Sequence, residues 1–271
     1  MACIKKKNQN NITRKIILVL LYTWTFVPFI PILIWSFSLR WNYPNLIPEF
    51  SLRAWKYVFT QKNIISSLFS SILISSVVTA ISLAIGLPAA KALGMYKFKG
   101  KKLISTLVTL PAIVPLLAVA MGIQVVFIKL GLSDSIYGVV LIHLVPVMPY
   151  MIMNLSSVYE AYNPEFEQQA RVLGANAFTT FYKITIPAIL PGIIVASMFS
   201  FIVSWSQYLL TLIIGGASTK TLPLLLFAFL NSGDYAIGGA ICIIFVLPAL
   251  ILLFGSSKYF AGTKSVRGGE V

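Results

Sequence analysis

The sequence predicts an all-α integral membrane protein with about six transmembrane helices, kinked spans and one cytoplasmic helix–turn–helix. Of its 271 residues, 58% are hydrophobic and only 10% are charged, a composition that soluble domains do not have. Several apolar runs approach or exceed the ~20 residues that a helix needs to cross a bilayer. One long polar passage, residues 163–191, interrupts these runs. We therefore expect this passage to lie outside the membrane.

Six apolar runs are the candidate spans: residues 16–37, 64–90, 103–128, 136–154, 188–214 and 235–256. Prolines in the first, third and fourth runs predict kinks, which neighbouring helices can accommodate. The first run follows a basic N-terminus, as in a signal peptide, but it is too long and no Ala-x-Ala cleavage site closes it. We expect an uncleaved first span. In the second run Ser67, Ser71, Ser75 and Thr79 share one helix face. Close helix packing is the simpler interpretation, and a polar pore lining is the alternative.

The basic residues are distributed unevenly between the two sides of the predicted membrane. With the N-terminus inside, 15 of the Lys and Arg residues fall in cytoplasmic segments and six fall in outer segments. Cytoplasmic loops carry such an excess in membrane proteins, so both termini and the 163–187 loop are predicted to be cytoplasmic. The net charge of +14 then reflects topology and contact with membrane lipid, and we expect no nucleic-acid partner.

The polar passage begins with the local signals of a helix. Asn163 is a good N-cap, and Pro164 suits the first helical position, where its missing N–H costs nothing. Glu165 and Glu167 follow in the first turn, where the helix dipole favours negative charge. Gly174 is suited to end this helix. The sequence therefore predicts a short helix between Pro164 and Gly174.

A second short helix is predicted directly after the first. Asn176 can cap it, and Phe178, Phe181 and Tyr182 share one of its faces. In the first helix Phe166, Ala170 and Leu173 form an apolar stripe by their spacing. We expect the chain to make this helix–turn–helix outside the membrane and to re-enter at Pro187.

This passage resembles the EAA loop of ABC-transporter permeases, the membrane subunits of binding-protein-dependent importers. The family pattern is Glu-Ala-Ala, three residues, Gly, nine residues, Ile, one residue and Leu-Pro. Ala170, Gly174, Ile184 and Pro187 match at that spacing. Gln168 replaces the glutamate, and we expect Glu167 to take over its charge. The alternative interpretation is an ordinary polar loop.

The resemblance extends over nearly the whole chain and is strongest to spermidine/putrescine-type permeases and their relatives for phosphonates, iron or thiamine. It implies the type I ABC importer permease fold and a multi-pass protein of the cell membrane. The implied partners are a second permease, identical or different, two cytoplasmic ATP-binding subunits and an external substrate-binding protein. ATP and Mg would be bound by the ATPase, with no cofactor in this chain. Sugar-importer permeases fit less well, because their SFKP-like sequence after the first span is missing.

The resemblance also implies a division of the chain and a set of contact residues. Residues 1–63 would form the N-terminal tail, first span and outer loop, 64–257 the permease core with its EAA-like loop at 160–187, and 258–271 a cytoplasmic tail. The predicted ATPase-coupling residues are Glu165, Phe166, Glu167, Gln168, Ala170, Gly174, Phe178, Phe181, Ile184 and Pro187.

A polar and aromatic cluster interrupts the fifth apolar run and is the candidate substrate path. It comprises Ser204, Trp205, Gln207 and Tyr208. Polar side chains at membrane depth are costly unless they pair or line a cavity. Related permeases often carry an acidic residue where Gln207 stands, so its absence weakens the case for a polyamine substrate. Two interpretations remain open, a translocation path and packing against neighbouring helices.

Other function classes find little support in the sequence. It has no Ser/His/Asp arrangement and no HExxH motif, so we predict neither catalytic nor metal-binding residues. The lone His143 in a span is expected to hydrogen-bond between helices. Residues 216–221 lack the second glycine of a phosphate-binding loop. All seven acidic residues fall in loops, tails or span edges, which disfavours an ion-coupled secondary transporter, the main alternative.

Overall fold

The computed structural model describes residues 15, 17–21, 23–24, 26–39, 41 and 47–262. Across these ranges the chain is helical, and its one β feature is an isolated antiparallel bridge between Ser38 and Phe50. The chain divides into two compact units. The first comprises residues 1–62 and 226–246, and the second comprises residues 63–225 and 247–271. The division at 63/64 and 257/258 predicted from the sequence stays a prediction.

The first unit contains α2 (Phe29–Ser36) and α3 (Arg53–Thr60) together with the start of α13 (Tyr235–Gly262). Trp35 packs against Trp41 and Tyr235, with ring centroids 5.4 and 5.1 Å apart. Arg53 pairs with Asp234 at 3.8 Å. The predicted first span, residues 16–37, lies partly outside the described residues, which place α2 at its C-terminal end.

The second unit contains the longest helices. They are α4 (Lys62–Met95), α5 (Lys101–Ile113), α6 (Leu116–Lys129), α7 (Ile136–Ala161), α10 (Ile186–Trp205) and α11 (Leu209–Gly215), followed by the first turn of α12 (Leu222–Asn231), most of which belongs to the first unit, and by the rest of α13. Within the described residues four helices are long and apolar enough to cross a membrane, or five if the bent pair α5–α6 forms one span. The second, fourth, fifth and sixth predicted spans therefore correspond to observed helices.

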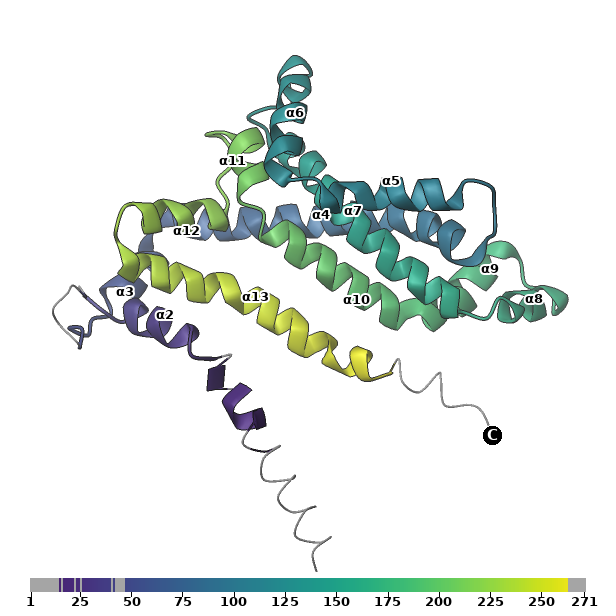
Figure 1. The fold of residues 1–271 in the computed structure, drawn as a ribbon, viewed down its shortest axis with the longest axis horizontal. Helices are drawn as coiled ribbons and strands as arrows, with labels where there is room; N and C mark the ends of the chain where they lie inside the picture. Colours follow the sequence, from purple (N-terminus) through teal and green to yellow (C-terminus); the bar gives the residue numbers. More distant parts are fainter. Residues whose placement is uncertain are drawn as a thin grey trace, which may run out of the picture. The chain divides into compact units, whose positions relative to one another are not determined.

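The third predicted span is not a continuous helix. It is broken between α5 and α6, whose axes meet at 99° (Figure 1). Pro115 has no N–H to donate and disfavours helical backbone in the residue before it, and Val114 is accordingly extended, with φ −70° and ψ 135°. The sequence predicted a kink here, but the bend is much sharper than a kink.

The fifth predicted span has different ends from those expected at 188 and 214. One helical stretch runs from Ala177 to Trp205, so the chain does not end a separate short helix and re-enter at Pro187. A π-helical turn, Phe181–Thr185, lies just before this proline. Its wider hydrogen-bonding pattern accommodates a residue that cannot donate to the preceding turn. The stretch then stops at Trp205, and α11 starts after a three-residue break.

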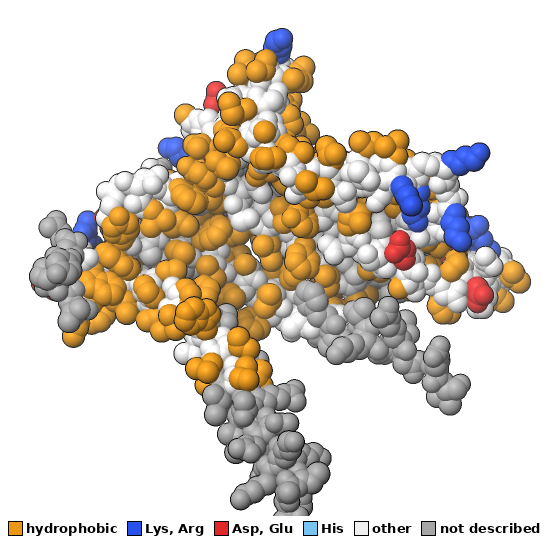
Figure 2. All heavy atoms as spheres, viewed as in Figure 1, with side chains coloured by type: hydrophobic (Ala, Val, Ile, Leu, Met, Phe, Trp, Pro, Cys, Tyr) orange, Lys and Arg blue, Asp and Glu red, His pale blue; other side chains and the backbone are white. Residues whose placement is uncertain are grey.

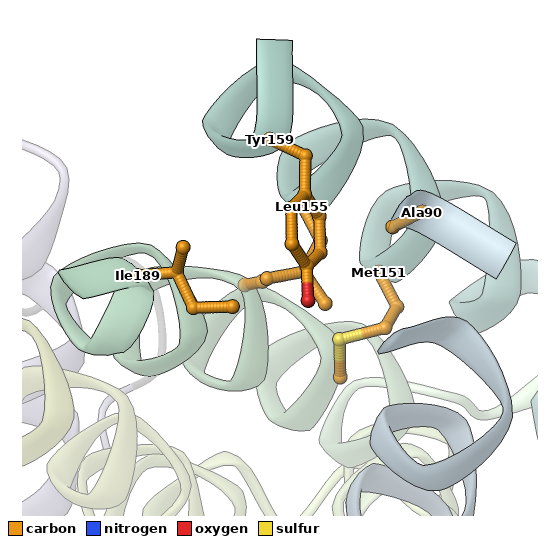
Figure 3. Packing of buried hydrophobic residues seen from close by; sticks show 6 residues of the cluster. Ala90, Met151, Leu155, Tyr159 and Ile189 are labelled. Carbon is orange, nitrogen blue, oxygen red and sulfur yellow. The ribbon is translucent and has the colours of Figure 1, made fainter. Parts of the chain in front are cut away.

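A cluster of buried residues joins α4, α7 and α10. Figure 3 shows Ala90 of α4, Met151, Leu155 and Tyr159 of α7 and Ile189 of α10 packed together. The helices α4 and α7 approach each other closely at Gly94, where an added Cβ would lie 2.6 Å from the Ser156 carbonyl oxygen. A residue without a side chain permits this approach. Four serines of the second span, Ser67, Ser71, Ser75 and Ser82, are buried as well, and the Leu222 N–H donates to Ser71 Oγ at 2.8 Å. These contacts favour helix packing over a pore lining for the serine face.

Candidate functional site

The helix α8 (Glu165–Val172) opens the polar passage with the expected cap. Asn163 Oδ1 accepts the Glu165 N–H at 2.9 Å, and Asn163 Nδ2 donates to Glu165 Oε2 at 3.2 Å. Glu165 and Glu167 occupy its first turn, where they offset the positive end of the helix dipole. The local sequence therefore determines where this helix begins, within one residue of the predicted start.

The end of α8 is a Schellman motif centred on Gly174. This glycine has a φ of +86°. Its N–H donates to the Arg171 carbonyl at 3.0 Å, and the Ala175 N–H donates to the Ala170 carbonyl at 3.0 Å, which is the bonding pattern of that motif. Nothing lies within 4 Å of a Cβ added at this position. The requirement for glycine is therefore one of backbone conformation and not of space.

The second helix of the loop is α9 (Ala177–Thr180), which continues into the π turn. Asn176 Oδ1 accepts the Thr179 N–H at 2.7 Å, as predicted. Tyr182 packs against Phe178 and Phe181, with ring centroids 4.4 and 5.3 Å apart. The two helices thus form a folded helix–turn–helix that carries an aromatic group on its second arm.

Glu167 connects this loop to two long helices. Lys91 Nζ of α4 donates to Glu167 Oε1 at 2.8 Å and lies 3.1 Å from Oε2, and Thr185 Oγ1 donates to Oε1 at 2.8 Å. Burial by itself would raise the pKa of Glu167, but the hydrogen bonds from Lys91 and Thr185 and the attraction of Lys91 and Arg171 hold it below its usual value. The carboxylate is therefore charged and fully engaged inside the chain.

The predicted coupling residues divide into an exposed and a buried set. Glu167 and Ala170 are buried, with 8% and 6% of their surface exposed, and Phe181 and Ile184 are partly buried. The exposed members are Glu165, Phe166, Gln168, Gly174, Phe178 and Pro187. Gln168 is exposed, whereas the charge of its neighbour Glu167 faces the interior of the chain. That Glu167 replaces the family's glutamate therefore stays a prediction.

The sequence reasoning missed the most exposed apolar residues of the loop. Val172 and Leu173 are each 87% exposed, and Tyr182 is 55% exposed. Leu173 was expected to form one apolar stripe with Phe166 and Ala170, and of these three only Ala170 is buried. The exposure of Val172 and Leu173 could have been predicted from their position directly before Gly174, since the residues that precede such a glycine form the tip of the turn.

Charged side chains surround this end of the second unit. Figure 2 shows Lys and Arg side chains gathered where α5 begins and near α8, together with acidic ones. Lys97 and Lys99 of the α4–α5 turn and Lys102 at the start of α5 are exposed. Hydrophobic side chains dominate much of the remaining visible surface in the same figure. This pattern is typical of a polar cap at the end of a membrane-embedded bundle.

The candidate substrate-path residues lie at the break between α10 and α11. Ser204 and Trp205 are buried, each 2% exposed, whereas Gln207 and Tyr208 are only partly buried. Gln207 Nε2 donates to the Val203 carbonyl oxygen at 3.2 Å, and Trp205 stacks on Phe201 with a centroid distance of 5.9 Å. Ser204 and Trp205 therefore serve packing within the chain, and Gln207 and Tyr208 are left as path candidates.

His143 of α7 spans this break. Its Nδ1 lies 3.0 Å from Ser204 Oγ, before the break, and its Nε2 lies 3.0 Å from Thr211 Oγ1, after it. Thr211 Oγ1 donates its hydrogen to the Gln207 carbonyl at 2.9 Å. Nε2–H must then donate to Thr211, and in a neutral ring Nδ1 accepts from Ser204. The lone histidine is a hydrogen-bonding bridge between helices, as its position predicted.

Comparison with known proteins identifies the family. Residues 82–264, more than half of the chain, match the family described as the binding-protein-dependent transport system inner membrane component. The chain belongs to this family. It is a permease, a multi-pass transmembrane subunit of a binding-protein-dependent ABC importer, and the match does not favour a secondary transporter.

Two curated relatives cover most of the permease. The spermidine/putrescine transport system permease protein PotC of Haemophilus influenzae is 23% identical over 240 residues, which are 89% of this chain and 93% of the relative. The putative 2-aminoethylphosphonate transport system permease protein PhnV of Salmonella typhimurium is 27% identical over 245 residues, covering 87% and 89%. The permease therefore resembles the spermidine/putrescine-type group, as the sequence predicted.

Solved structures share its fold. A bacterial ABC transporter involved in the import of the acidic polysaccharide alginate aligns with a TM-score of 0.72 at 20% identity, covering 93% of the permease and 97% of that chain. The MetNI methionine ABC transporter aligns with a TM-score of 0.61 at 14% identity, covering 74% and 95%. The permease thus has the all-α fold of type I ABC importer permeases.

Proposed function

We propose that the 163–187 loop docks onto a separate cytoplasmic ATPase and couples ATP hydrolysis to solute import. The observation that carries this proposal is the group of exposed apolar side chains on the loop: Phe166, Val172, Leu173, Phe178 and Tyr182. A polar loop outside the membrane has no lipid to cover such a group, and exposed apolar patches of this kind are interaction sites. The caps at Asn163, Gly174 and Asn176 hold it in one shape, which lowers the entropy cost of docking.

The proposal includes the orientation and the partners. Both termini and the loop lie in the cytoplasm, as the distribution of basic residues predicts. ATP and Mg are bound by two ATPase subunits, a second permease, identical or different, completes the translocation path, and an external binding protein delivers the substrate. Support comes from the family, and from the similar fold of transporters such as MetNI.

A docking-surface variant tests this function. Leu173→Glu places a charge at the tip of the loop, where it is exposed in the free chain and would be buried against a partner. We expect the variant to reach the membrane in normal amounts and to lose co-purification of the partner ATPase. Phe50, also exposed at 70% but outside the loop, provides the matched control Phe50→Glu. Equal recovery of the ATPase with Leu173→Glu and the wild type would refute the docking surface.

The substrate is proposed to be a small solute of the polyamine, phosphonate, iron or thiamine type. The relatives named for spermidine/putrescine and 2-aminoethylphosphonate support the first two classes. No acidic residue lies beside Gln207 at the break in the fifth span, so a cation would lack a carboxylate to offset its desolvation there. Uptake of labelled putrescine and 2-aminoethylphosphonate by cells that carry the whole transporter, compared with a deletion strain, separates these classes.

A further inference from the structure

We infer that Lys91 and Glu167 form an internal lock, which transmits movement of the coupling helix α8 to α4 and α10. This inference rests on the proposed function of the loop and adds a positioning role for Glu167 in the loop and for Lys91 on α4. Glu167 connects α8 with α4 and with the start of the fifth span, through Lys91 Nζ at 2.8 Å and Thr185 Oγ1 at 2.8 Å.

The helix α8 has few other attachments to the rest of the chain. Only Glu167 and Ala170 of its residues are buried. Ala170 offers a single methyl group, and Phe166 adds a ring contact with Tyr162 at the end of α7, with centroids 6.4 Å apart. The carboxylate of Glu167 provides the hydrogen-bonded connection from α8 to α4 and to the start of the fifth span. Without the ion pair, a displacement of α8 would bend the connections at 162–164 and 173–176 and would leave α4 and α10 in place. With the ion pair, a displacement of α8 also moves α4 and α10.

The anchor points of the lock are rigid. Lys91 follows Ala90, and Thr185 stands four residues, about one helical turn, before Ile189. Ala90 and Ile189 belong to the buried cluster with Met151, Leu155 and Tyr159 (Figure 3). Packed interiors are dense and transmit strain. Force applied at Glu167 is therefore delivered to a cluster that joins α4, α7 and α10.

The position of Glu167 also separates this role from direct docking. Both carboxylate oxygens are engaged inside the chain, and the residue is only 8% exposed. An ATPase cannot reach this charge without first breaking the contact with Lys91. The apolar tip residues recognise the partner, and the ion pair connects that recognition to the spans.

The test compares transport with ATP hydrolysis in the whole transporter, co-expressed with its ATPase, second permease and binding protein. In Lys91→Met the ATPase should co-purify and hydrolyse ATP as in the wild type. The amount of substrate transported per ATP hydrolysed should fall about tenfold, which lies within the usual range of coupling between distant sites. The charge exchange Lys91→Glu with Glu167→Lys should restore most of the transport. Lys99→Met is the matched control, since Lys99 is exposed in the turn that follows α4 and makes no ion pair among the described residues.

Several outcomes overturn the lock. Normal transport per ATP in Lys91→Met, or failure of the charge exchange to restore it, would contradict the role. If Lys91→Met does not reach the membrane, Thr185→Val takes its place, because it keeps the ion pair and the side-chain volume and removes one hydrogen bond. That variant should assemble normally and lose part of the coupling, and unchanged coupling would refute the lock. If no ATPase co-purifies even with the wild type, the proposed docking function fails instead.

Discussion

Glu167 and His143 are polar residues whose side chains form hydrogen bonds with residues that are distant in the sequence. Glu167 receives hydrogen bonds from Lys91 and Thr185, and His143 contacts Ser204 and Thr211. A buried polar group without a partner costs about 1–3 kcal/mol, so each residue is tolerated because its partners are in place. The two residues differ in their surroundings, because Glu167 lies in the polar loop and His143 lies within a membrane span. Only for Glu167 do we therefore predict an effect of pH on stability.

This dependence predicts how acid affects the protein. The pKa of Glu167 is held below its ordinary value of 4.5, so its stabilisation is fully present above pH 4.5 and is lost as the pH falls through the folded-state pKa. At pH 7 the wild type should be more stable than Glu167→Gln by about 1.5–3 kcal/mol, as expected for hydrogen bonds to a charged group. Thermal unfolding in detergent between pH 7 and pH 3 should show this difference shrinking with acid. A difference that stays constant over the range would contradict the assignment.

At the scale of elements, the short helices and the breaks determine the geometry of the chain. The α8 helix ends where Gly174 takes a φ of +86°, and the α4–α5 turn contains Gly100 with a φ of +88°. Neither position has a neighbour within 4 Å of an added Cβ. The two glycines therefore have the same backbone requirement in two different loops, which makes them a matched pair.

Gly174→Val and Gly100→Val should each cost about 1–2 kcal/mol, because a side chain disfavours the left-handed conformation. Only Gly174→Val should lose the ATPase, since only that residue shapes the docking loop. Melting temperatures and co-purification with the ATPase measure the two effects separately. Similar recovery of the ATPase with both variants would indicate that Gly174 only ends a helix.

The break after Trp205 gives a second prediction at this scale. Gln207 lies in the break and is partly exposed, so Gln207→Leu should lower transport while assembly and basal ATP hydrolysis stay unchanged. Gln124 of α6 is the matched control, because its Nε2 lies 3.5 Å from the Ile213 carbonyl oxygen of α11 and serves packing. Gln124→Leu should change stability more than transport. Failed assembly of Gln207→Leu with normal transport per complex would assign Gln207 to helix packing.

For the whole molecule, the membrane decides which surfaces are allowed. Many large apolar side chains of the described helices are exposed, including Leu107 and Phe254. Lipid or a partner permease can cover such a surface, whereas the polar loop must remain in water. The fifteen-to-six distribution of basic residues then predicts which side that loop occupies.

Cysteine accessibility tests this topology in a background without Cys3 and Cys242. Ala177→Cys, exposed in the coupling loop, should react with a membrane-impermeant reagent only after the cells are opened. Lys220→Cys, exposed between α11 and α12, should react in intact cells. Labelling of position 177 from outside, or of position 220 only from inside, would overturn the orientation.

The sequence by itself determined the features that depend on local chemistry. Asn163, Gly174 and Asn176 mark the ends of the coupling helices because caps act on backbone groups within three or four residues. The apolar runs predicted four of the observed long helices and, with the EAA-like spacing, the family. Pro115 predicted a kink. In each case the cause and the effect lie within a few residues of each other.

The tertiary structure decided what depends on contacts between distant residues. Lys91 and Glu167 are 76 positions apart, and His143 is 61 and 68 positions from its two partners. No local pattern indicates which helices approach, so neither pairing could be predicted. The 99° bend and the break after Trp205 were missed for the same reason, since proline permits a bend but packing sets its angle. The exposure of Leu173 also depends on the tertiary structure, because the spacing that places it in one stripe with Phe166 and Ala170 does not determine which of the three is buried.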